Sequence, residues 1–399
     1  MPVDDVDDPF GSEEGDEEDG HRMRPRSPQG PASNLWGTKE ILTDNWINLL
    51  LLFSPVGIVA SLHHWSATWI FFSNFFPIIP LAYLLGRATE EVANRTGQVF
   101  GGFLNATFGN AVEVILAIVG LRQNMVELIQ ASLLGSILSN MLLVLGCAFF
   151  MGGLQHKKQT FNTAIAVTNC SLLYLAVMAL SLPTVYKVII PDNRNEIDMS
   201  HLAAAGLAFT YVQFLYFQMG THSHLFEDAE EEADDPILTL FGAIFLMAII
   251  TIAVSVHTEF LVDAVEGTVK ATGLNERFIG IILLPIIGNA AEHVSAVTVA
   301  MKNKMTLAVN IALGSATQIS VCVIPMTVLI GWIMGVDMDL NFHVYEVLAM
   351  IVSVHLVAEV VRGGSSQWLA GSILMMAYVL IGAGFLYLPV LTDAEKGMA

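Results

Sequence analysis

Two short motifs place a carboxylate and an amide inside apolar sequence. The first, GNAVE, covers residues 109–113, and the second, GNAAE, covers residues 288–292. In each motif the asparagine and the glutamate are three residues apart, so they share one face of a helix, and the glycine lets another backbone approach closely. Carboxylate and amide oxygens are the ligands that Ca²⁺ prefers, in shells of about six to eight oxygens. The two motifs together therefore predict a site for a hard cation.

The two motif glutamates need a neutralising partner. An ionised side chain in a bilayer costs at least about 2.5–3.5 kcal/mol, and no Lys or Arg lies within the apolar stretches that hold Glu113 and Glu292. One Ca²⁺ ion neutralises both carboxylates, and so do two protons, but the ion and the protons cannot share the same oxygens. Because exclusive occupancy is the physical basis of cation/proton antiport, we expect Glu113 and Glu292 to couple transport to protons, with Asn110 and Asn289 as further ligands.

The motifs belong to a longer internal repeat. Residue i matches residue i+179 over 28 residues without a gap, and this register also pairs the GS at 135–136 with the GS at 314–315. After a three-residue slip, Glu90 is paired with Glu266. The chain therefore contains two related halves.

Small polar side chains follow each motif on otherwise apolar segments. Ser136 and Ser315 occupy matching positions of the repeat, and Gln318 matches a serine of the first copy. A lone serine in such a helix usually bonds back to the backbone or packs closely. Recurrence at matched positions favours a role in the site, so we expect these three side chains to line it.

The composition is that of a polytopic membrane protein. Of 399 residues, 54% are hydrophobic and only 14% are charged, whereas soluble domains carry about 25% charged residues. A spanning helix needs about 20 mostly apolar residues, which predicts an all-α polytopic membrane protein with about eleven transmembrane helices. The predicted segments are 44–63, 66–87, 99–120, 125–152, 161–186, 200–220, 236–262, 277–301, 305–335, 342–361 and 366–390.

The segments and the repeat together predict the domain order. Because each repeat holds five helices, an odd number, the second copy must enter the membrane inverted relative to the first, a recurring plan of secondary transporters with the ion site near the midplane. The predicted parts are a disordered acidic tail (1–40), one extra N-terminal helix (41–64), the first five-helix repeat (65–222), an acidic linker helix (223–236), the second five-helix repeat (237–390) and a C-terminal tail (391–399).

Charge outside the predicted helices is uneven. Of the 37 acidic residues, ten lie between Asp4 and Asp19 and seven lie in the stretch EDAEEEADD at 227–235. Eleven of the 17 Lys and Arg residues fall on the side of the N-terminus and six on the other side. The positive-inside rule then places the N-terminus and the acidic linker in the cytosol and the C-terminus outside it or in a lumen.

The acidic linker has two interpretations. A run of charge is usually a solvated segment. Four of its acids recur at helical spacing, however, and a short helix would gather them on one face that binds Ca²⁺ weakly and raises its local concentration. We favour this regulatory interpretation. The four residues are Glu227, Glu230, Glu231 and Asp234.

His293 directly follows the second motif glutamate. Its imidazole titrates near neutral pH, which suits a proton shuttle. It points to a different helix face from Glu292, however, and imidazole is a poor Ca²⁺ ligand. A role in the proton path and a role in packing both remain open.

These features resemble the vacuolar calcium/proton exchangers, a branch of the calcium/cation antiporter superfamily. The resemblance rests on GNAVE and GNAAEH, on the TEE before the first motif, on the GS 22 residues after each motif glutamate and on the acidic linker. It covers about 40–390 and looks closest to fungal members. It implies eleven helices, an acidic helix at the cytosolic membrane face, and transport of Ca²⁺ from the cytosol into the vacuole in exchange for protons.

The resemblance also implies a role for each site residue. Glu113 and Glu292 would be the central ligands and proton carriers, and backbone carbonyls around Gly109 and Gly288 would complete the shell. Glu90 and Glu266 would be outer carboxylates on the path of the ion or the proton. The side chains implied to line the site are Ser136, Ser315 and Gln318.

Three other classes of membrane protein were compared with these sequence features: other cation exchangers, cation channels and intramembrane enzymes. A sodium/calcium exchanger, or an exchanger of Mn²⁺ or another divalent cation, shares the inverted repeat. A cation channel would surround a symmetric pore with rings of oxygens, and an intramembrane enzyme would need a catalytic constellation that does not stand out here. We expect a transporter and not an enzyme, with Ca²⁺, H⁺ and membrane lipids as partners, no organic cofactor and no nucleic acid. The oligomeric state stays open.

Overall fold

The computed structural model describes residues 31–96, 104, 107–190, 195–226 and 236–388. These residues are almost entirely helical. Eight helices are long and apolar enough to cross a membrane, and two bent helix pairs raise that number to ten. The all-α membrane fold is therefore confirmed. The third predicted segment, 99–120, falls partly outside the described residues, so the predicted total of eleven is not tested.

The chain before the first repeat forms a bent pair of helices. α1 (Pro31–Thr43) meets η1 (Trp46–Leu52) and α2 (Phe53–Leu62) at an angle of 97°. The predicted tail, 1–40, is thus too long at its C-terminal end. α1 forms there because it packs against the start of the second repeat, where a Cβ on Gly37 would lie within 3 Å of the Ile237 and Leu238 side chains. Residues 1–30 lie outside the described residues.

The central helices of the two repeats match in position and length. The first-repeat elements are α5 (Ala111–Arg122), α6 (Val126–Leu138), η2 (Ser139–Val144) and α7 (Leu145–Gln155). The second-repeat elements are α14 (Ala290–Met301), α15 (Met305–Gln318), η7 (Ile319–Val323) and α16 (Ile324–Met334). α6 to α7 and α15 to α16 each form one continuous helix of 30 residues. The turns before them contain Asn124 and Asn303, both with positive φ, a conformation that asparagine tolerates at a helix end.

The remaining elements surround these central helices. In the first repeat they are α3 (Ala67–Thr96), β1 (Gln159–Thr160), α8 (Thr163–Ile189), α9 (Asn195–Tyr216), η3 (Phe217–Thr221) and η4 (Ser223–Leu225). In the second repeat they are α10 (Leu240–Asp263), α11 (Val265–Thr272), α12 (Glu276–Phe278), η6 (Ile279–Leu283), α13 (Leu284–Gly288), α17 (Val344–Val361), β2 (Ser365–Ser366) and α18 (Trp368–Tyr387). β1 and β2 pair antiparallel and so join the turn after α7 to the turn after α17.

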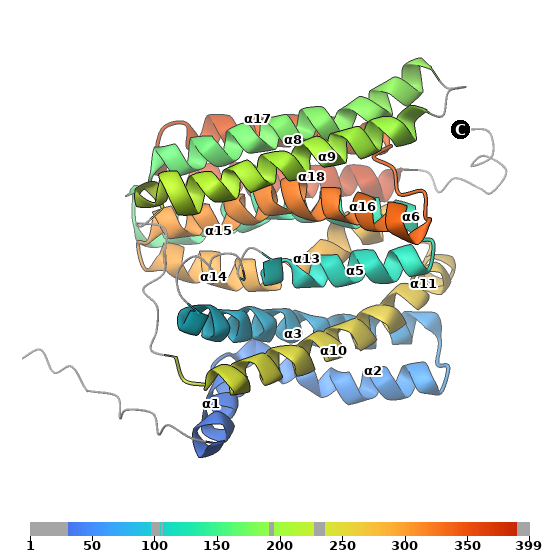
Figure 1. The fold of residues 1–399 in the computed structure, drawn as a ribbon, viewed down its shortest axis with the longest axis vertical. Coiled ribbons are helices and arrows are strands. Elements are labelled where there is room, and N and C mark those ends of the chain that lie inside the picture. Colours follow the sequence, from blue (N-terminus) through green and yellow to red (C-terminus); the bar gives the residue numbers. More distant parts are fainter. Residues whose placement is uncertain (1–30, 97–103, 105–106, 191–194, 227–235, 389–399) are drawn as a thin grey trace, which may run out of the picture.

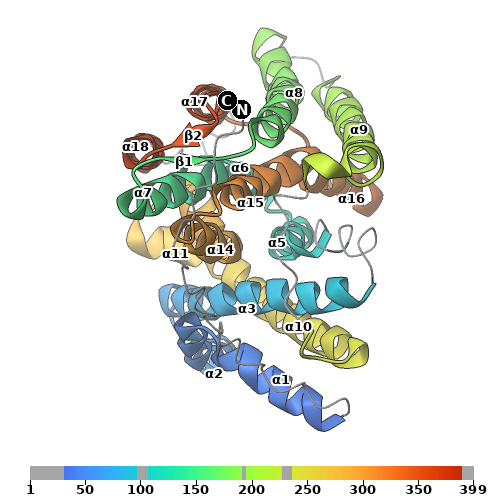
Figure 2. The same ribbon diagram turned by 90° about the vertical axis from the view of Figure 1, so that its left-hand side faces the viewer.

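The helices are arranged in layers. Figures 1 and 2 show α1, α2, α3 and α10 at one end of the long axis, α5, α13 and α14 in the middle, and α8, α9, α17 and α18 at the other end. Two separate apolar clusters hold these layers, one around α3 and α10 and one around the two 30-residue helices. α5 and α14 lie between the clusters, so the two motifs reach the interior of the molecule.

Candidate functional site

Each motif lies at the start of a helix. Asn110 precedes α5 and Asn289 precedes α14, and Glu113 and Glu292 fall in the first turns of these helices. At the second motif the chain bends by 57° between α13 and α14. Such a break leaves backbone groups without helical partners, and the first turn carries the positive end of the helix dipole, which favours carboxylates. Figure 1 shows α5 and α14 running in opposite directions from the middle of the molecule.

Hydrogen bonds at the centre join each repeat to the other. Asn110 Nδ2 donates to Gln318 Oε1 at 2.9 Å, and Ser315 Oγ donates to Asn110 Oδ1 at 3.3 Å. On the opposite side, Asn289 Nδ2 donates to the Ser136 carbonyl oxygen at 3.1 Å. Each motif asparagine thus contacts the 30-residue helix of the other repeat at matched positions. The structure therefore brings Asn110 together with Gln318 and the Ser315 hydroxyl, and Asn289 together with the Ser136 backbone carbonyl.

The Glu113 carboxylate lies against the second motif. The side chain is 3% exposed, and a Cβ on Gly288 would lie 2.7 Å from Glu113 Oε1. Neither carboxylate oxygen has a hydrogen-bond partner among the described residues. Because a buried carboxylate without a partner is costly, this position calls for a bound cation or a proton.

Glu292 has a more open environment. The residue is half-buried on α14, and its Oε2 is enclosed without a hydrogen-bond partner in the described part of the chain. Gly288, four residues before Glu292, lies against the Glu113 carboxylate, so the two carboxyl groups belong to one site. Two like charges in a low-dielectric site repel, which favours a shared cation or protons.

Two amide oxygens at the site also lack partners. Among the described residues, Asn289 Oδ1 and Asn140 Oδ1 are buried without a hydrogen bond. Within those same residues, no group of three or more His, Cys, Asp and Glu side chains could hold a metal. The donor set is thus two carboxylates with amide, hydroxyl and carbonyl oxygens, which suits a hard cation better than a soft one.

Sequence reasoning missed Asn140. The side chain is fully buried, and its Nδ2 donates to Ser315 Oγ at 2.9 Å. It lies in η2, a π-helical segment that follows the site residues on the first long helix just as η7 does on the second; π segments are frequent at functional sites. Asn140 belongs to the run GSILSN, but the residue that matches it in the second repeat is Ile319, so it has no polar counterpart at the matched position.

The predicted outer carboxylates lie at the surface. Arg87 Nη1 is 3.0 Å from Glu90 Oε2 on α3, and Glu266 on α11 forms an ion pair with Lys270. The structure does not bring either glutamate to the two motifs. Their place on the ion or proton path stays a prediction.

Two further predictions concern residues beside the site and beyond it. His293 is half-buried on α14, next to Glu292, and its role in the proton path is not tested. The regulatory face of the linker lies outside the described residues. That face comprises Glu227, Glu230, Glu231 and Asp234.

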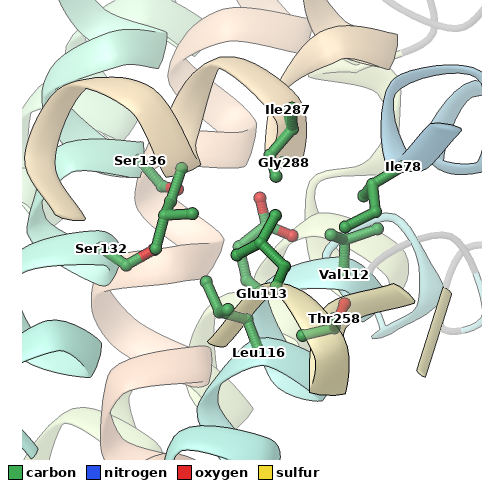
Figure 3. Close-up of a pocket in the computed structure, with 11 residues that line it drawn as sticks. Ile78, Val112, Glu113, Leu116, Ser132, Ser136, Thr258, Ile287 and Gly288 are labelled. Carbon is green, nitrogen blue, oxygen red and sulfur yellow. The ribbon is translucent and has the colours of Figure 1, made fainter. Parts of the chain in front are cut away.

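A small cavity adjoins the Glu113 side chain. Its volume is about 10 Å³, and its polar lining comprises Glu113, Ser132, Ser136 and Thr258. Apolar side chains and Gly288 supply the rest. Figure 3 shows the Glu113 carboxylate in the middle of these residues, with the two serines on one side and Thr258 on the other. Thr258 was not among the residues that the sequence singled out.

Comparison with known proteins gives consistent matches over most of the chain. A family model described as sodium/calcium exchanger protein matches residues 66–220 and 242–387. The vacuolar cation/proton exchanger 2 of Oryza sativa subsp. japonica is 41% identical over 88% of this chain and 84% of its own length. The vacuolar calcium ion transporter of Schizosaccharomyces pombe is 37% identical over 88% of this chain and 87% of its own, so the similarity extends to plant as well as fungal relatives.

A solved structure has the same fold. The structure of native YfkE superposes with a TM-score of 0.75 at 36% sequence identity, covering 86% of this chain and 100% of that chain. The fold, the two motifs and the relatives therefore all indicate a membrane cation exchanger.

Proposed function

The chain belongs to the sodium/calcium exchanger protein family, and from that premise we propose that it is a secondary active antiporter that moves Ca²⁺ from the cytosol into the vacuole in exchange for protons. The family consists of transporters, so the chain is not an enzyme. Cation/proton exchange, calcium and the vacuole are the terms in the names of its relatives in rice and fission yeast. The membrane-spanning helices agree with this activity.

The observation that carries the proposal is the pair of motif carboxylates with enclosed oxygens that lack hydrogen-bond partners among the described residues. Glu113 offers two oxygens without partners and Glu292 offers one, counted over the described residues. Ca²⁺ supplies the charge that both need, and protons supply the same neutralisation in its absence. Because the two kinds of occupant exclude one another, binding of Ca²⁺ displaces protons and protonation displaces Ca²⁺.

Neutral oxygens complete the proposed ion shell. Ser315 and Gln318 hold the Asn110 amide in place, and the Ser136 carbonyl holds the Asn289 amide. We assign ligand roles to backbone carbonyls near Gly109 and Gly288 and to five further residues. These are Asn110, Asn289, Ser136, Ser315 and Gln318. Water can replace a neutral ligand in a flexible Ca²⁺ shell but cannot replace a carboxylate charge.

We propose that the conformation described here opens toward the cytosol. Glu292 is half-buried whereas Glu113 is buried, and we therefore assign the ion entrance to the side of α14. The far end of α14 is followed by Lys302 and Lys304, residues of the side that the positive-inside rule assigns to the cytosol. Alternating access then requires the Glu113 side to open as the Glu292 side closes, as inverted repeats allow.

Ion flux in proteoliposomes tests the proposed function. Purified protein should take up Ca²⁺ when the vesicle interior is acidic, and a protonophore that collapses the gradient should abolish the uptake. A sodium gradient of the same size should drive none. Uptake that follows the sodium gradient and ignores the proton gradient would identify a sodium/calcium exchanger and contradict the proposal.

A further inference from the structure

α1 lies at nearly a right angle to the unit that follows it. It meets η1 and α2 at 97°, and Figure 1 shows it running across the direction of α2 and α10. The buried Asn48 side chain holds this bend, because its Nδ2 donates to the Leu42 carbonyl at 3.0 Å and to the Ile41 carbonyl at 3.3 Å. At such an angle α1 adds almost nothing to the depth that the η1–α2 unit can span.

The η1–α2 unit is long enough to cross a membrane without α1. Its 7 residues of 3₁₀-helix and 10 of α-helix span about 29 Å, and the hydrocarbon core of a bilayer is about 30 Å thick. Exposed tryptophans mark both ends of the unit, since Trp46 is 76% exposed and Trp65 is 48% exposed. Tryptophan is enriched where membrane meets water. α1, which ends at Thr43, therefore lies at the level of the lipid headgroups.

Buried polar contacts hold α2 beside two helices that cross the membrane. The ring nitrogens of His257 on α10 lie 2.8 Å from Ser54 Oγ on α2 and from Asn74 Oδ1 on α3. A Cβ on Gly57 of α2 would lie 2.7 Å from the Ser73 carbonyl oxygen of α3. Since α3 and α10 are long and apolar enough to span, α2 crosses the membrane beside them, and α1 lies in the membrane plane.

One side of α1 packs against the start of the second repeat. A Cβ on Gly37 would lie 2.8 Å from the Leu238 side chain, and Asn34 Oδ1 accepts a hydrogen bond from the Thr239 backbone N–H at 2.9 Å. Other apolar side chains of α1 are exposed, and we call them the outer side of α1. They are Leu35, Trp36 and Leu42.

The outer side of α1 suits the boundary between lipid headgroups and acyl chains. Leu35 and Leu42 are seven residues apart, so they share one face of the helix. Lys39 is exposed between them in the chain, and a lysine can bury its stem while its charge stays among headgroup phosphates. The next element, η1, exposes Leu49 and Leu52, which face lipid because the η1–α2 unit spans the membrane. The lipid-covered surface of η1 thus continues onto α1.

We propose that α1 is an in-plane membrane anchor, with Leu35, Trp36 and Leu42 inserted at the headgroup–acyl boundary of one leaflet. Interfacial helices bury their apolar side about 5–10 Å into this zone. The partner of the outer side is phospholipid and not another protein. Because Asn34 and Gly37 hold α1 to the residues just before α10, the anchor also fixes that end of α10 at the membrane surface.

Collisions of a spin label with two reagents measure where the outer side lies. The free cysteines are first replaced by alanine, a nitroxide is attached at Leu42→Cys, and the protein is placed in phosphatidylcholine vesicles. Oxygen concentrates among acyl chains, whereas a nickel chelate stays in water. The ratio of oxygen to nickel collisions at Leu42→Cys should exceed severalfold the ratio at Lys302→Cys, in an exposed turn. It should approach the ratio at Val56→Cys, on the exposed side of α2.

Photolabelling from the lipid tests the same claim on the wild-type chain and does not depend on the folding of a variant. A phosphatidylcholine with a diazirine near its headgroup should form adducts on the outer side of α1, located by mass spectrometry of the peptides.

Three results would overturn the anchor. They are a collision ratio at Leu42→Cys equal to that at Lys302→Cys, protection of Leu42→Cys from both reagents, and a wild-type α1 without lipid adducts. The first would show a solvated helix, and the second would show that a protein partner or a second copy of the chain covers the outer side. Neither measurement uses an ion gradient, so each leaves the proposed exchange of Ca²⁺ for protons untouched.

Discussion

Glu113 and Glu292 occupy the same position in two copies of one motif, yet their surroundings differ. Both lie in the first turn of a 12-residue helix. Glu113 is sealed, 3% exposed, with neither oxygen partnered among the described residues and a cavity at its side. Glu292 is half-buried. The repeat therefore supplies two carboxylates, and the packing around them buries Glu113 more completely than Glu292.

The difference arises from the neighbouring helices. In the register that pairs Glu90 with Glu266, the cavity residue Thr258 corresponds to Ala82, and in the i+179 register Ser132 corresponds to Ile311. Two of the three hydroxyl residues that line the cavity beside Glu113 thus have apolar counterparts in the other repeat, whereas Ser136 matches Ser315. Duplication gave the site its symmetry, and substitutions at these two positions made its halves unequal. We infer a division of labour in which Glu292 is the first of the two carboxylates to meet the entering ion.

The strongest test of this comparison removes the charge of either glutamate. Glu113→Gln and Glu292→Gln should each lower Ca²⁺ exchange by at least about 100-fold, because each change removes a charged ligand and a proton carrier. Glu359→Gln, at an exposed glutamate near Arg362 on α17, is the matched control and should retain full exchange. If either glutamate variant inserts into proteoliposomes as well as the wild type and still exchanges Ca²⁺ at the normal rate, then the pair Glu113 and Glu292 is not the transport site.

Chemical labelling tests the difference in access. A carbodiimide, which reacts with protonated carboxyl groups, should modify Glu292 severalfold faster than Glu113 in Ca²⁺-free protein, since Glu292 is the more exposed of the two. Ca²⁺ should protect both. Mass spectrometry of the peptides measures the two rates, and equal rates or faster reaction of Glu113 would contradict the proposed open side.

The two motif asparagines are held by different hydrogen bonds, one set from a side chain and the other from a backbone carbonyl. This difference predicts a smaller effect, on the Ca²⁺ affinity of two serine variants. Ser315→Ala removes a side chain that bonds to both Asn110 and Asn140, and a hydrogen bond contributes about 0.5–1.5 kcal/mol. Its Ca²⁺ affinity should therefore fall about three- to tenfold. Ser136→Ala keeps the backbone carbonyl that holds Asn289, so its affinity should change by less than about twofold. Equilibrium Ca²⁺ binding measures both, and the reverse order would show that these bonds do not organise the site.

Much of the central site could be predicted from the sequence because it is repeated. Motif spacing, matched serines and apolar run lengths are local signals, and the structure places Asn110, Ser315 and Gln318 together as the repeat indicates. The structure also extends the repeat register over all of α5 to α7 and α14 to α16.

The unrepeated features could not be predicted in the same way. Asn140 and Thr258 have apolar counterparts, and their surroundings depend on how α6, α10 and α15 pack. The helical start of α1 within the predicted tail depends on contacts with residues about 200 positions later in the chain. Such contacts leave no periodic pattern in the sequence, so only the three-dimensional packing shows them.

The most direct test of the central claim is the pH dependence of Ca²⁺ binding to detergent-solubilised protein between about pH 5.5 and 8. Without metal, repulsion between the buried carboxylates favours retention of at least one proton near neutral pH, and Ca²⁺ must displace it. Affinity should therefore strengthen as the pH rises, and adding Ca²⁺ to weakly buffered protein should release protons. Glu113→Gln should lose this dependence. An affinity that is the same at every pH, with no proton release on Ca²⁺ addition, would contradict competition between Ca²⁺ and protons at Glu113 and Glu292.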